Sequence, residues 1–229
     1  KAIKSPIPYR KVQALAPIAV TYAEIGQYNQ ALQVAQLIED TNSYRASALS
    51  AIAREYVKDG QPEQALQIAQ TLTNPPLKAT TLTAIAAEYA KKGQPDKAAQ
   101  VFSQALQAAE SVASVAIEYA EAGPPDAALQ VVPKINDRSA KATTLMAIAL
   151  VYSKAGQPDK ASATFSQALQ SYQEIQETAA KNRVLQEMID KSVKAGQYVQ
   201  VFQIAQTIED KFAKAETLEQ IATQAVESG

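Results

Sequence analysis

The stretch TLTAIAAEYAKKGQPDKAAQVFSQAL, residues 81–106, decides the expected fold. Leu82 and Ile85 stand eleven and eight residues before Gly93, and apolar residues three apart lie on one face of an α-helix. A lone glycine after such a helix commonly ends it, because glycine adopts the left-handed conformation without steric cost. The stretch therefore predicts a helix that ends at Gly93.

A second helix is expected directly after this glycine. Pro95 and Asp96 suit its first turn, because proline lacks only an amide that has no partner there and an acid meets the positive end of the helix dipole. Ala86, seven residues before the glycine, and Ala98, five residues after it, would let the two helices approach closely. Tyr89 would fill the space beside them. The unit is thus a helix, a tight turn and a helix.

The same pattern recurs at every glycine of the chain, and we expect each glycine to end a helix. The glycines are Gly26, Gly60, Gly93, Gly123, Gly156, Gly196 and Gly229. They are spaced by 34, 33, 30, 33, 40 and 33 residues, a period typical of stacked repeats. No proline or glycine lies between Asp159 and Ala195, so the second helix of the fifth repeat is expected to extend to about Thr178.

Two further comparisons within the chain are informative. Residues 78–107 and 141–170 lie 63 positions apart and agree at 22 of 30 positions, which indicates that a block of two repeats was duplicated. The sixth repeat has Ile189 and Val201 in place of the two alanines and Ser192 in place of the tyrosine. Because two small residues have grown while the large one has shrunk, we expect this pair to fold with a shifted helix crossing.

A unit of this length, with Leu, Ile, Ala and Tyr before a glycine and Ala, then Ala or Phe, after it, resembles the tetratricopeptide repeat. The resemblance covers about residues 11–229. Leu stands where the family prefers Trp, and no proline regularly ends the second helix. The resemblance implies an all-α fold, an α-α superhelix of six helix-turn-helix repeats that is followed by a capping helix.

These observations predict one repeat domain over residues 11–229, after an extended leader over residues 1–10. The capping helix is expected over residues 213–228, where Glu216 and Gln220 would face water. The six repeats are expected at about residues 11–44, 45–77, 78–107, 108–140, 141–180 and 181–212.

Composition narrows the possible functions. The 229 residues include neither histidine nor cysteine, so the commonest general base and the best transition-metal ligands are missing. We predict no catalytic residue, metal site or cofactor, and an enzyme is the least expected class. A net charge of -1 disfavours nucleic acid as a partner.

The compartment is less constrained. The longest apolar run, from Leu145 to Tyr152, is shorter than the about 20 residues that span a bilayer. The expectation is a soluble protein without membrane insertion, cytoplasmic by default. Lys1 in place of methionine suggests a trimmed or processed chain, which leaves export open.

In the family that the chain resembles, positions five, nine and twelve of the unit line a concave groove. By this resemblance the candidate partner-binding residues are Val20, Ser50, Arg54, Thr83, Ala87, Ala113, Ile117, Met146 and Leu150. Most are small or apolar, which suits a partner helix or an extended peptide. In the other interpretation, which applies to Val20 and Ile117, neighbouring first helices bury this surface among themselves.

The fold predicts function only in general terms. The leading hypothesis is a non-enzymatic scaffold that binds a protein or peptide in the groove. One alternative is a structural protein that self-assembles through the groove or an end of the solenoid, and a less favoured one is an RNA-binding array. Acids just before bases at the repeat junctions, such as Asp137 before Lys141, are interpreted either as helix caps or as a charged stripe for a partner.

Overall fold

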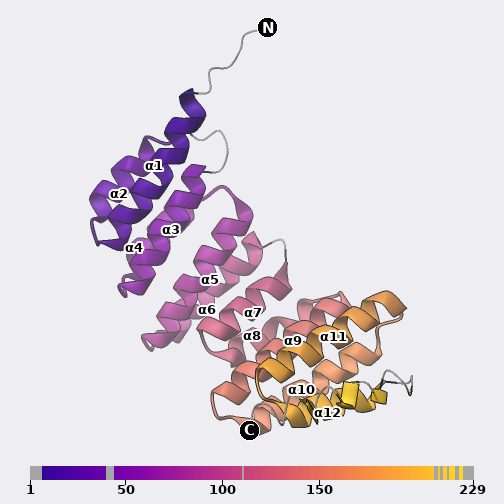
Figure 1. Ribbon diagram of the computed structural model, residues 1–229. Helices are drawn as coiled ribbons and strands as arrows, with labels where there is room; N and C mark the ends of the chain where they lie inside the picture. The colour runs from indigo at the N-terminus through magenta and orange to yellow at the C-terminus, as the bar shows by residue number, and fades with distance from the viewer. Residues whose placement is uncertain are drawn as a thin grey trace. The chain divides into compact units, whose positions relative to one another are not determined.

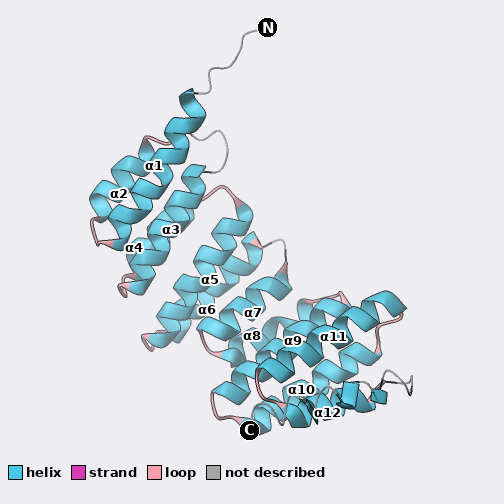
Figure 2. Cartoon of the chain, in the orientation of Figure 1, coloured by secondary structure: helices cyan, strands magenta, loops and turns pink. Residues whose placement is uncertain are grey.

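The computed structural model describes residues 7–39, 44–109, 111–208, 211, 214, 215, 217–219, 222 and 223, with the backbone alone for 7–13. Over these residues the chain forms twelve α-helices and one 3-10 helix and no strand (Figure 2). The predicted all-α fold class, a helical repeat solenoid, is confirmed. The chain divides into two compact units, Lys1–Pro124 and Pro125–Gly229.

The described part of the first unit is a stack of helices. They are α1 Ile7–Glu24, α2 Tyr28–Gln36, α3 Tyr44–Lys58, α4 Pro62–Thr71, α5 Pro75–Lys91, α6 Pro95–Ala108 and α7 Val112–Ala122 (Figure 1). α1, α3, α5 and α7 contact one another in succession, while α2, α4 and α6 each contact the helix before them. Each pair therefore buries its apolar side against the next pair.

The second unit has the same construction. Its elements are α8 Pro125–Val131, the 3-10 helix η1 Val132–Lys134, α9 Arg138–Lys154, α10 Pro158–Gln173, α11 Thr178–Lys194 and α12 Tyr198–Gln206. α9 contacts α10, α11 contacts α12, and α9 also contacts α8 and α11. The boundary between the two units falls between α7 and α8, within the fourth helix pair.

The small residues lie where the two helices of a pair meet. Ala86 of α5 is fully buried, and Ala98 of α6 is 2% exposed. The tyrosine beside them, Tyr89, is 2% exposed, and its equivalents Tyr119 and Tyr152 are also buried. The predicted structural role of alanine and tyrosine is confirmed, because close helix approach needs both small contact points and a filled space beside them.

Five of the turn glycines have the expected left-handed backbone. They are Gly26, Gly60, Gly93, Gly156 and Gly196. At Gly93 the amide of Gln94 donates to the carbonyl of Tyr89 at 3.0 Å, which closes the helix end. Gly123 is the exception, with φ -133 and ψ -155, because Pro124 follows and disfavours helical backbone before it. Gly229 lies outside the described residues.

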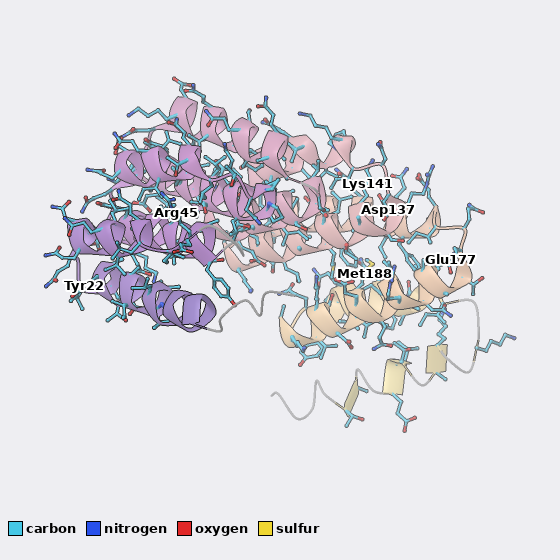
Figure 3. The ribbon with its side chains drawn as sticks, turned by 90° about the horizontal axis from the view of Figure 1, so that it is seen from above. Tyr22, Arg45, Asp137, Lys141, Glu177 and Met188 are labelled. Atoms are coloured by element: carbon cyan, nitrogen blue, oxygen red, sulfur yellow. The ribbon has the colours of Figure 1, made fainter. Side chains whose placement is uncertain are left out.

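Several helices begin as the sequence predicts. α4, α6 and α10 begin with proline and have an acid in the first turn. At the start of α9 the Asp137 carboxylate accepts a hydrogen bond from the amide of Ala140 at 2.7 Å, and Lys141 lies nearby (Figure 3). The helix-cap interpretation is therefore confirmed at Asp137. The acids at the other two such junctions, Asp40 before Arg45 and Asp210 before Lys214, lie outside the described residues.

The first helix starts earlier than predicted. α1 begins at Ile7, so residues 7–10 are helical and the prediction of an extended leader is wrong there. Pro8 stands in the first turn, where a missing amide leaves no hydrogen bond unmade. Pro17 lies inside α1 at an exposed position.

The second helix of the fifth pair ends earlier than predicted. α10 is long, with 16 residues, but it stops at Gln173 and not near Thr178. Ile175 is the physical reason. Its side chain is buried, and its amide donates to the carbonyl of Tyr172 at 3.1 Å, which turns the chain away from the helix axis.

The sixth pair folds despite its unusual residues. Ile189, Ser192 and Val201 are all buried, and the Ser192 hydroxyl donates to the carbonyl of Met188 at 2.8 Å. The buried hydroxyl is thereby satisfied within its own helix. The predicted capping helix lies mostly outside the described residues, and the repeat boundaries remain a proposal.

Candidate partner-binding face

Equivalent positions of the first helices form a row along the first unit. α1 contributes Val20, α3 Arg54, α5 Ala87 and α7 Ile117, each six residues before the glycine of its turn. Arg54 is exposed, Val20 and Ile117 are half-buried, and Ala87 is buried. The row therefore presents one cationic and two apolar side chains to a partner.

Several predicted groove residues are covered by their neighbours. Those that are buried are Ser50, Thr83, Ala87 and Met146. The hydroxyl oxygens of Ser50 and Thr81 lie 2.7 Å apart, between α3 and α5. The Thr83 hydroxyl donates to the carbonyl of Ala79 at 2.8 Å. These hydroxyls are bonded within the protein, so the expectation that such residues face an open groove is not met for them.

The remaining predicted residues are accessible. They are Val20, Arg54, Ala113, Ile117 and Leu150. The mutual burial that was expected for Val20 and Ile117 is only partial, since both side chains are half-buried. Leu150 belongs to the second unit, where it lines a small hollow together with Met146, Phe165 and Gln200 from α9, α10 and α12.

Glu118 of α7 adds a carboxylate that the sequence pattern missed. Burial raises the pKa of its half-buried side chain, and Glu121 raises it further. Arg54 and a hydrogen bond with Thr80 lower the pKa of Glu118. Arg54, Thr80 and Glu118 thus interact although they come from α3, α5 and α7. Glu118 stands five residues before its glycine, a position to which the groove pattern assigns no role.

Outside this face, a second set of polar side chains holds neighbouring pairs together. In the first unit Lys97 Nζ of α6 lies 3.3 Å from Glu63 Oε1 of α4 and 5.2 Å from the ring centroid of Tyr89. A backbone hydrogen bond, and then Lys97, lower the pKa of Glu63. Burial, and then the Glu63 carboxylate, raise the pKa of Tyr89. We name this acid, tyrosine and lysine the brace.

The second unit repeats the brace with Asp126, Tyr152 and Lys160. Lys160 Nζ donates to the two carboxylate oxygens of Asp126 at 2.7 and 3.0 Å, and the Tyr152 hydroxyl donates to Asp126 Oδ1 at 2.9 Å. The lysine hydrogen bond lowers the pKa of Asp126, while burial and then Asp126 raise the pKa of Tyr152. The sequence carries a signal for the brace. In both sets the acid stands 34 residues before the lysine, and the two sets lie 63 residues apart.

The described residues offer little for other kinds of chemistry. Among them no cluster of three or more potential ligands could hold a metal ion. Nor does any helix among them have the length and apolar character needed to cross a membrane. The candidate site is the accessible row on the first helices.

These features define the class of protein as an all-α helical repeat protein. The family model of the tetratricopeptide repeat matches residues 79–111 and 142–174, so these two segments are similar to tetratricopeptide repeats. The resemblance noted in the sequence is thereby confirmed. Repeats of this family generally mediate protein–protein interaction and are not catalytic.

Comparison with other proteins adds little beyond the family. No curated protein matches the chain. Among solved structures, the crystal structure of Ton1535 from Thermococcus onnurineus NA1 matches at 17% identity, over 96% of this chain and 92% of that chain, with a TM-score of 0.26. A TM-score this low carries no argument about fold or function.

Proposed function

We propose that the row of accessible side chains on α1, α3 and α7 binds a peptide or a helix of another protein. The observation that carries the proposal is that Val20, Arg54 and Ile117 are accessible at equivalent positions of stacked helices. Apolar anchors supply most of the binding free energy of such contacts.

The charges on this face narrow the kind of partner. Arg54 and Glu118 carry opposite charges and interact across α5. Complementary charges give specificity more than affinity. The best partner therefore has an apolar side chain flanked by charged groups of both signs, and a uniformly charged tail is disfavoured.

Affinity capture from the native lysate tests the proposal. Arg54→Glu reverses an exposed charge, and Ile117→Glu places a charge among the apolar contacts. Gln67→Glu, on the exposed outer face of α4, is the matched control because it adds the same carboxylate elsewhere. We expect the wild type and Gln67→Glu to capture the same proteins and the two face variants to lose them. Equal capture by all four would refute the proposal.

A second candidate function is self-assembly. The large hydrophobic side chains that are exposed among the described residues are Ile18, Ile25, Leu37, Val199 and Phe202. All of them belong to the first and last described helix pairs. Exposed apolar patches often mark interaction surfaces. We therefore propose, as the alternative, that a second copy packs on one of these pairs.

Light scattering over a range of concentrations tests this alternative. Self-assembly predicts a mass that rises with concentration in the wild type. The mass should stay at the monomer value either in Ile25→Gln and Leu37→Gln, if the first pair is the contact, or in Phe202→Gln, if the last described pair is. A wild type that stays monomeric at high concentration removes the alternative. That result leaves the proposal for the row on α1, α3 and α7 intact.

A further inference from the structure

The turns of the first two helix pairs border a hollow of about 400 Å³ on the first unit. Five carboxamide side chains line it, those of Gln27, Asn29, Gln30, Gln61 and Gln64. The rings of Tyr28 and Tyr56 complete its lining, together with Gly26. No charged side chain is among the residues that line the hollow.

The carboxamides have hydrogen-bonding capacity to spare. Gln27 and Gln61 stand at the N-terminal ends of α2 and α4, but neither side chain caps its helix. No hydrogen bond joins the side chain of Asn29, Gln30 or Gln64 to another group in the described part of the chain. Each carboxamide offers two N–H donors and one carbonyl acceptor. The hollow therefore presents donors and acceptors together without net charge.

The tyrosines give the hollow a fixed flat wall. The rings of Tyr28 and Tyr56 stack with their centroids 3.7 Å apart and an interplanar angle of 15°. The Tyr28 hydroxyl donates to Asp59 Oδ2 at 2.5 Å. Tyr56 is buried, whereas Tyr28 is only half-buried. One side of the Tyr28 ring is thus held by its neighbour, and part of this side chain remains exposed at the hollow.

The next pair of turns carries charged side chains at the equivalent positions. Asn29 and Gln64 occupy the positions that Glu63 and Lys97 occupy one repeat later, three and four residues after their glycines. There the acid and the lysine are the ion pair of the brace, with Lys97 Nζ 3.3 Å from Glu63 Oε1. At the first turns two neutral carboxamides replace the ion pair, and Tyr28 covers Tyr56 where Lys97 covers Tyr89.

We propose that this hollow binds an uncharged carbohydrate. The hydroxyl groups of a sugar both donate and accept hydrogen bonds, as carboxamides do. The apolar C–H face of a sugar ring can lie against the flat ring of Tyr28. A lining without charge gives no advantage to an anion or a cation, and the volume lies within the range of about 300–1,000 Å³ that is typical of small-molecule sites.

Titration with free maltotriose and free N,N′,N″-triacetylchitotriose tests the proposal, followed by the side-chain amide signals in NMR spectra and by calorimetry. We expect saturable binding of at least one trisaccharide, with shifts at Asn29 and Gln64. Tyr28→Ala should weaken it by about tenfold or more. The double variant Asn29→Glu, Gln64→Lys, which we name the closing variant, should abolish binding, because it places the ion pair of the next turn across the hollow.

The closing variant is expected to fold, since the chain already holds that pair at Glu63 and Lys97. Repeating the titration with the same sugars attached to a neutral carrier protein distinguishes a free sugar from a glycan as the ligand. Absence of binding to the wild type in both forms, or binding that the closing variant leaves unchanged, overturns the proposal. Binding of a glutamine-rich peptide in place of the sugars also overturns it. Ile117→Glu should leave sugar binding unchanged, so the test is independent of the row on α1, α3 and α7.

Discussion

The two copies of the duplicated block keep the tyrosine and lysine of the same brace but differ on the candidate partner-binding face. In each copy the tyrosine and lysine join an acid of the pair before the block, and the only change is from Glu63 to Asp126. On the face, the buried Ala87 of the first copy corresponds to the half-buried Leu150 of the second. The contacts that hold the pairs together have thus stayed alike, while the side chains available to a partner have changed in size.

The difference shows how one helix pair can serve two purposes. The brace and the buried alanines determine how closely neighbouring helices approach. The face then depends on a few positions that packing does not restrict, such as position 150. Each of the following variants tests whether the two copies are alike in the brace and unlike on the face.

Loss of the brace tyrosine should have the largest effect. Tyr152 is fully buried and Tyr89 is 2% exposed. Replacing either with alanine leaves a cavity, so each variant should lower the free energy of unfolding by about 3–5 kcal/mol. Urea denaturation of both variants measures this. A large loss in only one copy would contradict the equivalence of the two braces.

Exchanging the face residues between the copies should have a smaller and unequal effect. Ala87→Leu inserts a larger side chain at a buried position, and overpacking of this kind costs about 1–3 kcal/mol. Leu150→Ala removes a half-buried side chain, which costs about 1 kcal/mol on the basis of buried apolar area. Thermal unfolding of the two single variants compares them. Equal costs would mean that the two positions have the same environment.

Replacing the brace tyrosine with phenylalanine tests how much its hydroxyl alone contributes to stability. Tyr152→Phe keeps the ring but removes the hydrogen bond to Asp126, and it should cost about 1–2 kcal/mol. Tyr119→Phe is the matched control. Tyr119 stacks on Phe102, and its hydroxyl makes no hydrogen bond within the described residues, so its loss should leave the unfolding free energy nearly unchanged. If both variants lose similar amounts of unfolding free energy, the Tyr152 hydroxyl makes no special contribution to the brace.

The smallest expected effect on the free energy of unfolding is its pH dependence through Asp126. Lys160 lowers the pKa of Asp126 in the folded state, so its contribution is present above the ordinary aspartate pKa of about 4 and is lost as the pH falls through the lowered value. The pair is half exposed, which keeps the contribution under about 1 kcal/mol. Asp126→Asn should therefore cost more at about pH 7 than at about pH 3 in urea denaturation. An equal loss of unfolding free energy at the two pH values would contradict an ionic contribution of Asp126 to the brace.

Much of the fold could be predicted from the sequence because its determinants are local. The glycine that ends a helix and the proline that begins the next one act within a few residues, as at Gly93 and Pro95. Gly123 departs from the pattern, although the reason, Pro124, stands beside it in the sequence. The early end of α10 could not be predicted in this way, because it goes with the burial of Ile175, which no local sequence pattern indicates.

The candidate face was predicted less completely. The spacing identified the helices that carry Arg54 and Ile117, and both side chains are accessible. It could not predict the burial of Ser50, which depends on how closely α5 approaches α3. It also missed Glu118, because interaction with Arg54 requires that α3 and α7 present these residues on the same side of α5.

Site-specific photo-crosslinking tests the central claim most directly. A photoreactive amino acid replaces Arg54 in one variant and Gln67, on the outer face of α4, in the other, and the products formed in the native lysate are compared. The account predicts that position 54 crosslinks to a discrete partner protein and that position 67 does not. Crosslinking of the same partner only from position 67, or equally from both, would contradict a partner-binding face on the first helices.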